Sequence, residues 1–146
     1  MIMEKKQCIR ILVIGIEQQM NAKIIEAMNK KELHMLAERP VDFSIKGFSN
    51  YKDASAYLAD AENKTIPTFV FLDYFGGNGV SGPHIVEILK QHYPQAEVIL
   101  ISNNEDEIGA VRQQYDNNKV FDYVIKDDYT PTLCRLLLEK YVEKYS

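Results

Sequence analysis

The stretch "TFVFLD" at residues 68–73 decides the fold, because it is a short apolar run that ends abruptly in a carboxylate, Asp73. Two further runs have the same form but end in other polar residues: Val98–Ile101 before Ser102, and Val120–Ile125 before Lys126. Short apolar runs bounded by turn signals are typical of strands buried on both faces of a parallel sheet. The carboxyl ends of such strands meet at one edge, where ligands bind. We therefore expect Asp73, Ser102 and Lys126 to converge on one small pocket.

The rest of the chain alternates between strand-like and helix-like patterns, which predicts βαβ units around a parallel sheet. Ile9–Ile16 predicts a first strand, and the alternation of Val41, Phe43 and Ile45 with polar residues predicts an edge strand solvated on one side. Helical spacing predicts five helices. The first is marked by Met20, Ile24, Ala27 and Met28, and the second by Asn50 as a cap with Ala54, Leu58 and Ala61 inward. The third has Pro83 at its first position with Ile85, Val86, Ile88 and Leu89 inward, and the fourth has Glu105, Asp106 and Glu107 in its first turn. The fifth begins at Thr130 and Pro131, with Leu133, Leu136 and Leu137 inward.

Composition and charge narrow the class of protein. A chain of 146 residues predicts one domain over residues 1–146, and a net charge of −4 without a basic stripe argues against a nucleic-acid partner. The apolar run 9–16 contains Arg10 and is too short to span a bilayer, so we expect no membrane segment. Cys8 and Cys134 lie far apart and the histidines form no ligand pair, which argues against a zinc site and favours a reducing cytoplasm.

The three strand-end residues suit one kind of chemistry. A carboxylate such as Asp73 can attack an activated phosphoryl donor and become an acyl phosphate. Lys126 would place a positive charge on the phosphoryl oxygens, and Ser102 would donate a hydrogen bond to them. A phosphoryl group adds about −1.5 to −2 charges, which is enough to bias two conformations. The pattern therefore predicts a phosphoacceptor site.

On these residues the chain resembles a response-regulator receiver domain of two-component signalling over essentially its whole length. "FVFLDYF" matches the phosphoacceptor strand, "SGPHIVEILKQHYPQAEVILIS" the following helix and strand, and "FDYVIKDD" the lysine strand. The resemblance implies a flavodoxin-like three-layer α/β/α sandwich whose five-stranded parallel sheet has the order 2-1-3-4-5. It also implies that Asp73 is the phosphoacceptor, that Ser102 and Lys126 contact the phosphoryl group, and that Tyr123 is the switch aromatic. A half-buried aromatic at a sheet edge explains Tyr123 equally well.

The end of the first strand departs from the family pattern. The family has two adjacent carboxylates there that help to hold Mg²⁺, whereas "LVIGIEQQ" puts Gly15 and Ile16 in those positions. Glu17 is the nearest acid, one residue too late, so Asp73 and Glu17 are the candidate metal ligands. Mg²⁺ prefers octahedral oxygen coordination with one or two carboxylates. We expect its affinity to be reduced.

Two receiver-type functions follow. In the first, the chain is a stand-alone receiver, not an enzyme: it takes a phosphoryl group from a histidine kinase or phosphotransfer protein and signals to an unidentified output protein. The resemblance places that contact on the face made by the fourth helix, fifth strand and fifth helix. In the second, it is a degenerate receiver that binds a partner independently of phosphorylation. The missing acid pair favours the second, and the set Asp73, Ser102, Lys126 and Tyr123 favours the first.

A third hypothesis is a dinucleotide-binding domain. Residues 77–82 spell G-x-G-x-x-G between an expected strand and helix, and Glu105 follows the next strand about 20 residues on. However, the glycines begin several residues after the strand ends, not in the tight turn that brings a phosphate onto the helix N-terminus. This hypothesis is the weakest of the three.

Overall fold

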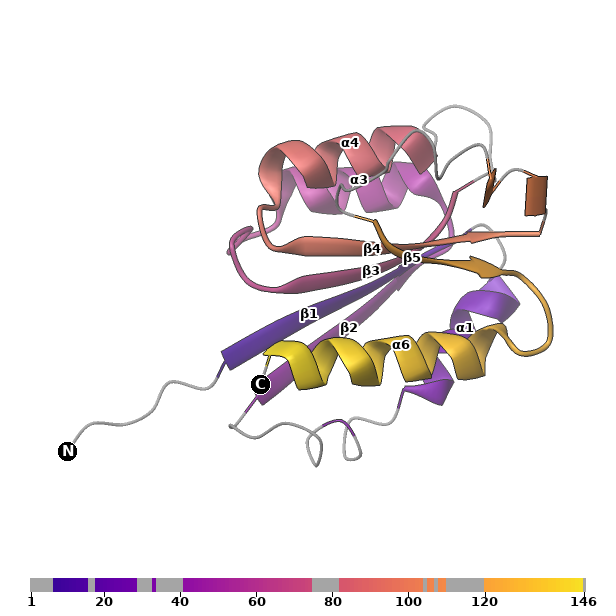
Figure 1. Cartoon of the computed structure of the whole chain (residues 1–146). Coiled ribbons are helices and arrows are strands. Elements are labelled where there is room, and N and C mark those ends of the chain that lie inside the picture. The colour runs from indigo at the N-terminus through magenta and orange to yellow at the C-terminus, as the bar shows by residue number, and fades with distance from the viewer. Residues whose placement is uncertain are drawn as a thin grey trace.

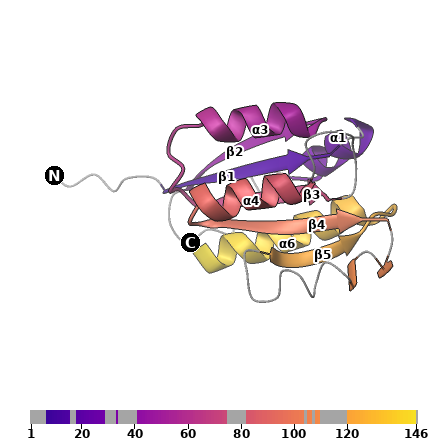
Figure 2. The same cartoon turned by 90° about the horizontal axis from the view of Figure 1, so that it is seen from above.

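The computed structural model describes residues 7–15, 18–28, 33, 41–74, 82–103, 105–106, 108–109 and 120–145. Five strands form one parallel sheet in the order β2-β1-β3-β4-β5, as predicted (Figures 1 and 2). Their bounds are β1 (Gln7–Ile14), β2 (Val41–Phe48), β3 (Thr68–Asp73), β4 (Ala96–Ser102) and β5 (Val120–Ile125). The first strand thus ends two residues earlier than the expected Ile16, which itself lies outside the described residues.

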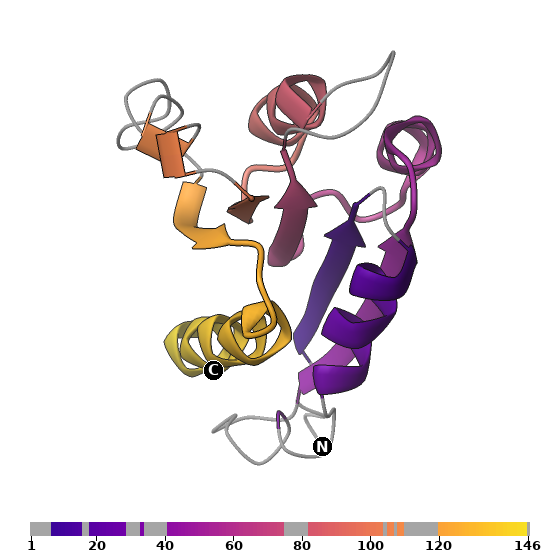
Figure 3. The ribbon, with the colours of Figure 1, turned by 90° about the vertical axis from the view of Figure 1, so that its right-hand side faces the viewer.

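Helices cover both faces of the sheet, which confirms the three-layer sandwich. The helices with complete bounds are α1 (Gln18–Ala27), α3 (Tyr51–Asp60), α4 (Gly82–His92) and α6 (Thr130–Tyr145). Figure 3 looks along the strands and shows α1 and α6 on one face, with α3 and α4 on the other. Residues 105, 106, 108 and 109 are also helical, at the place of the expected acidic first turn.

The continuous apolar run of β3 divides its side chains between two cores. Phe69 and Phe71 belong to the core under α1 and α6, where the ring of Tyr141 stacks on Phe69 at 4.3 Å between centroids. Val70 and Leu72 belong to the core under α3 and α4. Successive strand residues point to opposite faces, and both faces are covered here. The unbroken run is therefore explained by the helices on each side.

The edge strand β2 has the predicted half-buried pattern. Val41 and Phe43 are buried, while the intervening Asp42 and Ser44 are exposed. The Asn50 cap is also confirmed, because its side chain accepts a hydrogen bond of 2.8 Å from the Asp53 N–H at the start of α3. This bond satisfies one of the amides that the first helical turn leaves without an intrahelical partner.

Gly82 is required by close packing at the start of α4. A Cβ atom on residue 82 would overlap the backbone carbonyl of Tyr74, which follows β3. The last glycine of the G-x-G-x-x-G pattern therefore has a packing explanation that needs no nucleotide. Gly77 and Gly79 lie outside the described residues. The helix begins at Gly82, so Pro83 is its second residue instead of its first.

The prediction for the inward face of α6 was wrong for two of three leucines. Leu133 and Leu136 are 41% and 47% exposed, whereas Leu137 is partly buried as expected. The buried face follows a stripe displaced by one position, which consists of Cys134, Leu138, Tyr141 and Val142. Both stripes have helical spacing, but only the second places the Tyr141 ring on Phe69 of the sheet.

Candidate functional site

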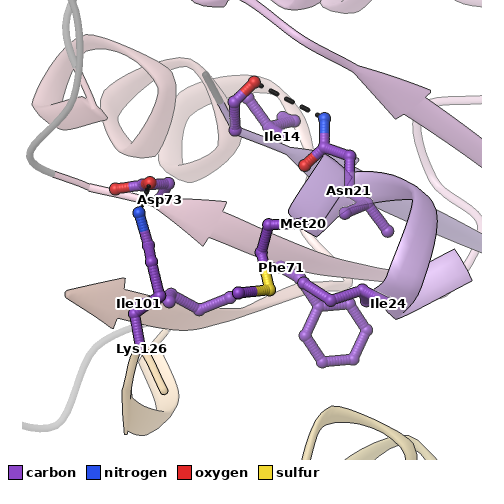
Figure 4. Close-up of a pocket in the computed structure, with 10 residues that line it drawn as sticks. Ile14, Met20, Asn21, Ile24, Phe71, Asp73, Ile101 and Lys126 are labelled. Carbon is purple, nitrogen blue, oxygen red and sulfur yellow. Dashed lines mark hydrogen bonds and ion pairs between the residues drawn. The ribbon is translucent and has the colours of Figure 1, made fainter. Parts of the chain in front are cut away.

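The candidate site lies at the carboxyl ends of the central strands, where Asp73 and Lys126 form an ion pair. Asp73 is the last residue of β3 and is 8% exposed. Lys126 follows β5, and its Nζ donates to Asp73 Oδ2 across the end of β4 (Figure 4). Parallel pairing of three neighbouring strands puts these ends at one edge. The structure thus brings together a carboxylate and an ammonium that are distant in sequence.

Ser102 ends the strand between them. Its neighbour Ile101 is paired with Asp73 in the sheet, and its own carbonyl accepts a hydrogen bond of 2.7 Å from the Lys126 N–H. Ser102 is 1% exposed. All three predicted residues therefore lie at one edge, with direct side-chain contact between Asp73 and Lys126. Their roles toward a phosphoryl group stay predictions.

The other predicted site residues are placed less centrally. Tyr123 pairs with Leu100 in the sheet and packs, partly buried, against the core under α3 and α4. Tyr123 and Ile125 of β5 line a surface hollow of about 300 Å³. The other described residues that line this hollow are Glu105, Ile108 and Gly109. The candidate metal ligand Glu17, like Ile16, lies outside the described residues.

Gly15 occupies the first of the two adjacent positions where the family resemblance implied an acid. A Cβ atom built on Gly15 would lie 3.6 Å from the Cβ of Asp73, so a side chain there would stand directly beside the carboxylate. The same Cβ position lies 2.7 Å from Asn21 Oδ1. Asn21, from the first half of α1, therefore fills the space that a side chain on residue 15 would use.

Backbone acceptors hold Asn21 in this place. Its Nδ2 donates to the Phe48 carbonyl at 2.6 Å and, at a long 3.5 Å, to the Gly15 carbonyl, which Figure 4 marks with a dashed line. The Gly15 N–H in turn donates to the Phe48 carbonyl at 3.0 Å. Asn21 is 8% exposed, so these bonds satisfy an amide that burial would otherwise penalise.

The hollow between α1 and the ion pair is small. Its walls include Met20, Asn21 and Phe71, with Asp73 and Lys126 at its opening toward the strand ends (Figure 4). It encloses about 10 Å³, roughly the space that one water molecule needs. A group as large as a phosphoryl group would not fit inside this hollow.

Tyr51 also contacts the candidate phosphoacceptor. Its hydroxyl, on the first residue of α3, donates a hydrogen bond to the backbone carbonyl of Asp73. Tyr51 is 3% exposed, so the bond is buried. Neither Tyr51 nor Asn21 was predicted from the sequence. The one feature of the sequence that could have indicated Tyr51 and Asn21 is that each stands near the start of a helix that follows a strand.

The described side chains do not fit a magnesium site. Asp73 is the only acid among the described residues that line the hollow, and it is already paired with Lys126. Across the described part of the chain, no three His, Cys, Asp or Glu side chains gather closely enough to hold a metal ion. Mg²⁺ would need one or two carboxylates and several further oxygens in octahedral geometry. The described residues alone therefore do not form a magnesium site.

Two solved structures of response regulators share the fold of this chain. A response regulator from Colwellia psychrerythraea has 16% identity, with 94% of this chain and 98% of that chain covered and a TM-score of 0.60. A two component response regulator from Cytophaga hutchinsonii has 20% identity, with 92% and 97% covered and a TM-score of 0.58. The fold is that of a receiver domain. The predicted resemblance is confirmed at this level.

The receiver fold is also shared by a structure described as an adenylate cyclase from Rhodopirellula baltica. It has 15% identity, covers 93% of each chain and has a TM-score of 0.56. No family model and no curated protein sequence matches this chain. At these identities the likeness shows the fold alone.

Among the described helices, none has both the length and the hydropathy that a bilayer crossing requires.

Proposed function

We propose that this chain is a receiver-type signalling domain of a phosphorelay, with Asp73 as the phosphoacceptor. The observation that carries the proposal is the Asp73–Lys126 ion pair at the carboxyl edge of a receiver fold. The donor is a phosphohistidine on a histidine kinase or phosphotransfer protein, and the domain acts as a switch, not as an enzyme. Cys8 and Cys134 are free, which supports a reducing compartment such as the cytoplasm.

The proposed transfer uses groups that the site contains. A carboxylate oxygen of Asp73 attacks phosphorus, a P–O bond forms, the P–N bond of phosphohistidine breaks, and the imidazole leaves and takes up a proton. Lys126 Nζ moves from the carboxylate to the phosphoryl oxygens and neutralises their charge. The Ser102 hydroxyl moves toward the same phosphoryl group and donates a hydrogen bond to it. The Tyr123 ring then turns inward as the hydroxyl moves.

We propose that output passes through contacts with a partner protein on the side of β5 and α6. Tyr129, Leu133 and Leu136 are 73%, 41% and 47% exposed and recur along one face of the last helix and its approach. The hollow beside Tyr123 lies on the neighbouring side of β5. Large apolar side chains gathered on a surface favour a protein contact. The exposure of Leu133 and Leu136 thus supports the partner surface.

A second candidate function is supported by the substitution at the end of β1. Gly15 supplies no acid, and the Asn21 amide takes its space, so the usual means of binding Mg²⁺ is missing. A degenerate receiver that binds its partner without phosphorylation would need no acid at this position. The same exposed face would serve as its binding surface.

Intact mass after incubation with acetyl phosphate separates the two functions. We expect the wild type to gain one phosphoryl group and Asp73→Asn to gain none, because the amide cannot form the acyl phosphate. A Ser102→Ala variant is the matched control, since it keeps the acceptor and should be phosphorylated to a lesser extent. Failure of the wild type to gain mass, also with a phosphohistidine donor, would favour the phosphorylation-independent module.

A further inference from the structure

Among the described residues, the side chain of Asn21 occupies the space beside Asp73 that an acid on residue 15 would need. Residue 15 directly follows β1, and a Cβ atom built on it would lie 3.6 Å from the Asp73 Cβ. Asn21 Oδ1 lies 2.7 Å from that built atom, closer than side-chain atoms pack in practice. An acidic side chain at residue 15 and the present position of Asn21 therefore exclude each other.

The charge of the pocket differs accordingly from that of a metal site. Among the described side chains that line the hollow, only Asp73 and Lys126 carry charge, and they neutralise each other. A divalent cation would have to share the Asp73 carboxylate with the like-charged Lys126 ammonium, and among the described side chains it would gain only one acid. A phosphoryl donor, in contrast, meets no excess of negative charge that a cation must first offset.

We propose that the Asp73 pocket works without a divalent cation, and that Asn21 is the positioning residue that makes it so. Asn21 closes the space beside Gly15 and ties α1 to the end of β2 through the Phe48 carbonyl, which also accepts a hydrogen bond from the Gly15 N–H. Lys126 is then the cation that faces the phosphoryl group. The metal-binding part stands on geometry alone, whereas the phosphoryl part rests on the proposed function.

Mn²⁺ binding, followed by the loss of the free-ion EPR signal, tests the metal-binding part directly. Wild type and Asp73→Asn should titrate identically, because Asp73 holds no ion. A Gly15→Asp/Asn21→Ala variant should bind Mn²⁺ at least about tenfold more tightly than the wild type, since it pairs two carboxylates. Adding Asp73→Asn to that variant should abolish the gain. Asn21→Ala alone is the matched control and should gain nothing.

Two results would overturn the proposal. The first is Mn²⁺ binding by the wild type that Asp73→Asn abolishes, a comparison that does not depend on whether the redesigned variants fold. The second is a Gly15→Asp/Asn21→Ala variant that is folded by circular dichroism but gains no Mn²⁺ affinity, because residues 15 and 21 would then not be the cause.

Phosphorylation provides the remaining arm and separates this inference from the proposed function. The extent of acetyl phosphate labelling of the wild type should agree within about twofold in EDTA and in excess Mg²⁺, because Lys126 supplies the charge without a metal ion. Labelling that requires Mg²⁺ would overturn the inference but keep the phosphoacceptor. Absence of labelling in both conditions would overturn the phosphoacceptor and the phosphoryl part together, while the Mn²⁺ result would stand.

Discussion

At the scale of single residues, Tyr51 ties α3 to the backbone of the candidate phosphoacceptor. Replacing Tyr51 by Phe keeps the buried ring but removes the donor to the Asp73 carbonyl. Loss of a buried hydrogen-bond partner costs about 1–3 kcal/mol. We therefore expect the free energy of unfolding, measured by urea denaturation, to fall by about this amount.

Tyr57→Phe provides the comparison for this measurement. Tyr57 lies on the same helix, but it is only half-buried, and its ring packs at 5.2 Å from that of Phe48 near the edge strand. Its loss of stability should stay within about 0.5 kcal/mol, as for most surface substitutions. Equal effects of the two variants would show that the Tyr51 hydroxyl does not stabilise the position of Asp73.

The residues that sequence patterns reveal and those that they miss differ in the kind of partner they use. Asp73 and Lys126 end apolar strand runs, and the topology of a parallel sheet brings such ends together. Asn21 and Tyr51 bond to the backbone carbonyls of Phe48 and Asp73. Every residue has a carbonyl, so no side-chain pattern announces these contacts. They became visible only with the relative placement of helix and sheet.

At the scale of elements, α6 shows how far helical periodicity can determine a buried face. Its run of leucines at 136, 137 and 138 permits two inward stripes that differ by one position. The choice between them depends on the partner surface, here the ring of Phe69 under Tyr141. The sequence of a helix taken alone does not contain that surface. The strand patterns, by contrast, gave unambiguous faces because continuous burial requires helices on both sides.

Alanine substitutions in adjacent leucine stripes test this assignment. Leu138 is completely buried in the core under α1 and α6, so Leu138→Ala should cost about 2–5 kcal/mol through lost burial and the cavity it leaves. Leu136 is 47% exposed, and Leu136→Ala should change stability by no more than about 0.5 kcal/mol. Urea denaturation of both variants measures the difference. A greater loss from Leu136→Ala would contradict the observed face of α6.

At the scale of the whole molecule, the order of the strands was predictable from the sequence. The filling of the space beside Gly15 by the Asn21 side chain was not. Alternating strand and helix patterns limit the chain to βαβ units with right-handed crossovers, which leaves few sheet orders. The family resemblance then selected the order that the structure has. The missing acids were also visible in the sequence. That the Asn21 amide fills the space at Gly15 required the packing of α1 against the strand ends.

Burial in the folded molecule also changes the pKa of one thiol, that of Cys134. Cys134 is completely buried between α6 and the sheet, and desolvation raises the pKa of its thiol from 9.0 to about 12. Above pH 9 the unfolded chain releases this proton while the folded chain keeps it. The unfolded state is then favoured, so the free energy of unfolding falls as pH rises, by up to about 1.4 kcal/mol per pH unit for this one group.

Comparison with Cys134→Ala isolates this effect, because the tyrosines and the other thiol ionise in both proteins. Burial of the thiol stabilises the wild type fully below pH 9, and this contribution is lost as pH rises toward 12. Between pH 8 and pH 10, the wild type should therefore lose about 1 kcal/mol more stability than the variant. Urea denaturation in reducing buffer at pH 8, 9 and 10 measures the difference. Parallel pH profiles would mean that the thiol ionises equally in both states and that the core around it admits water.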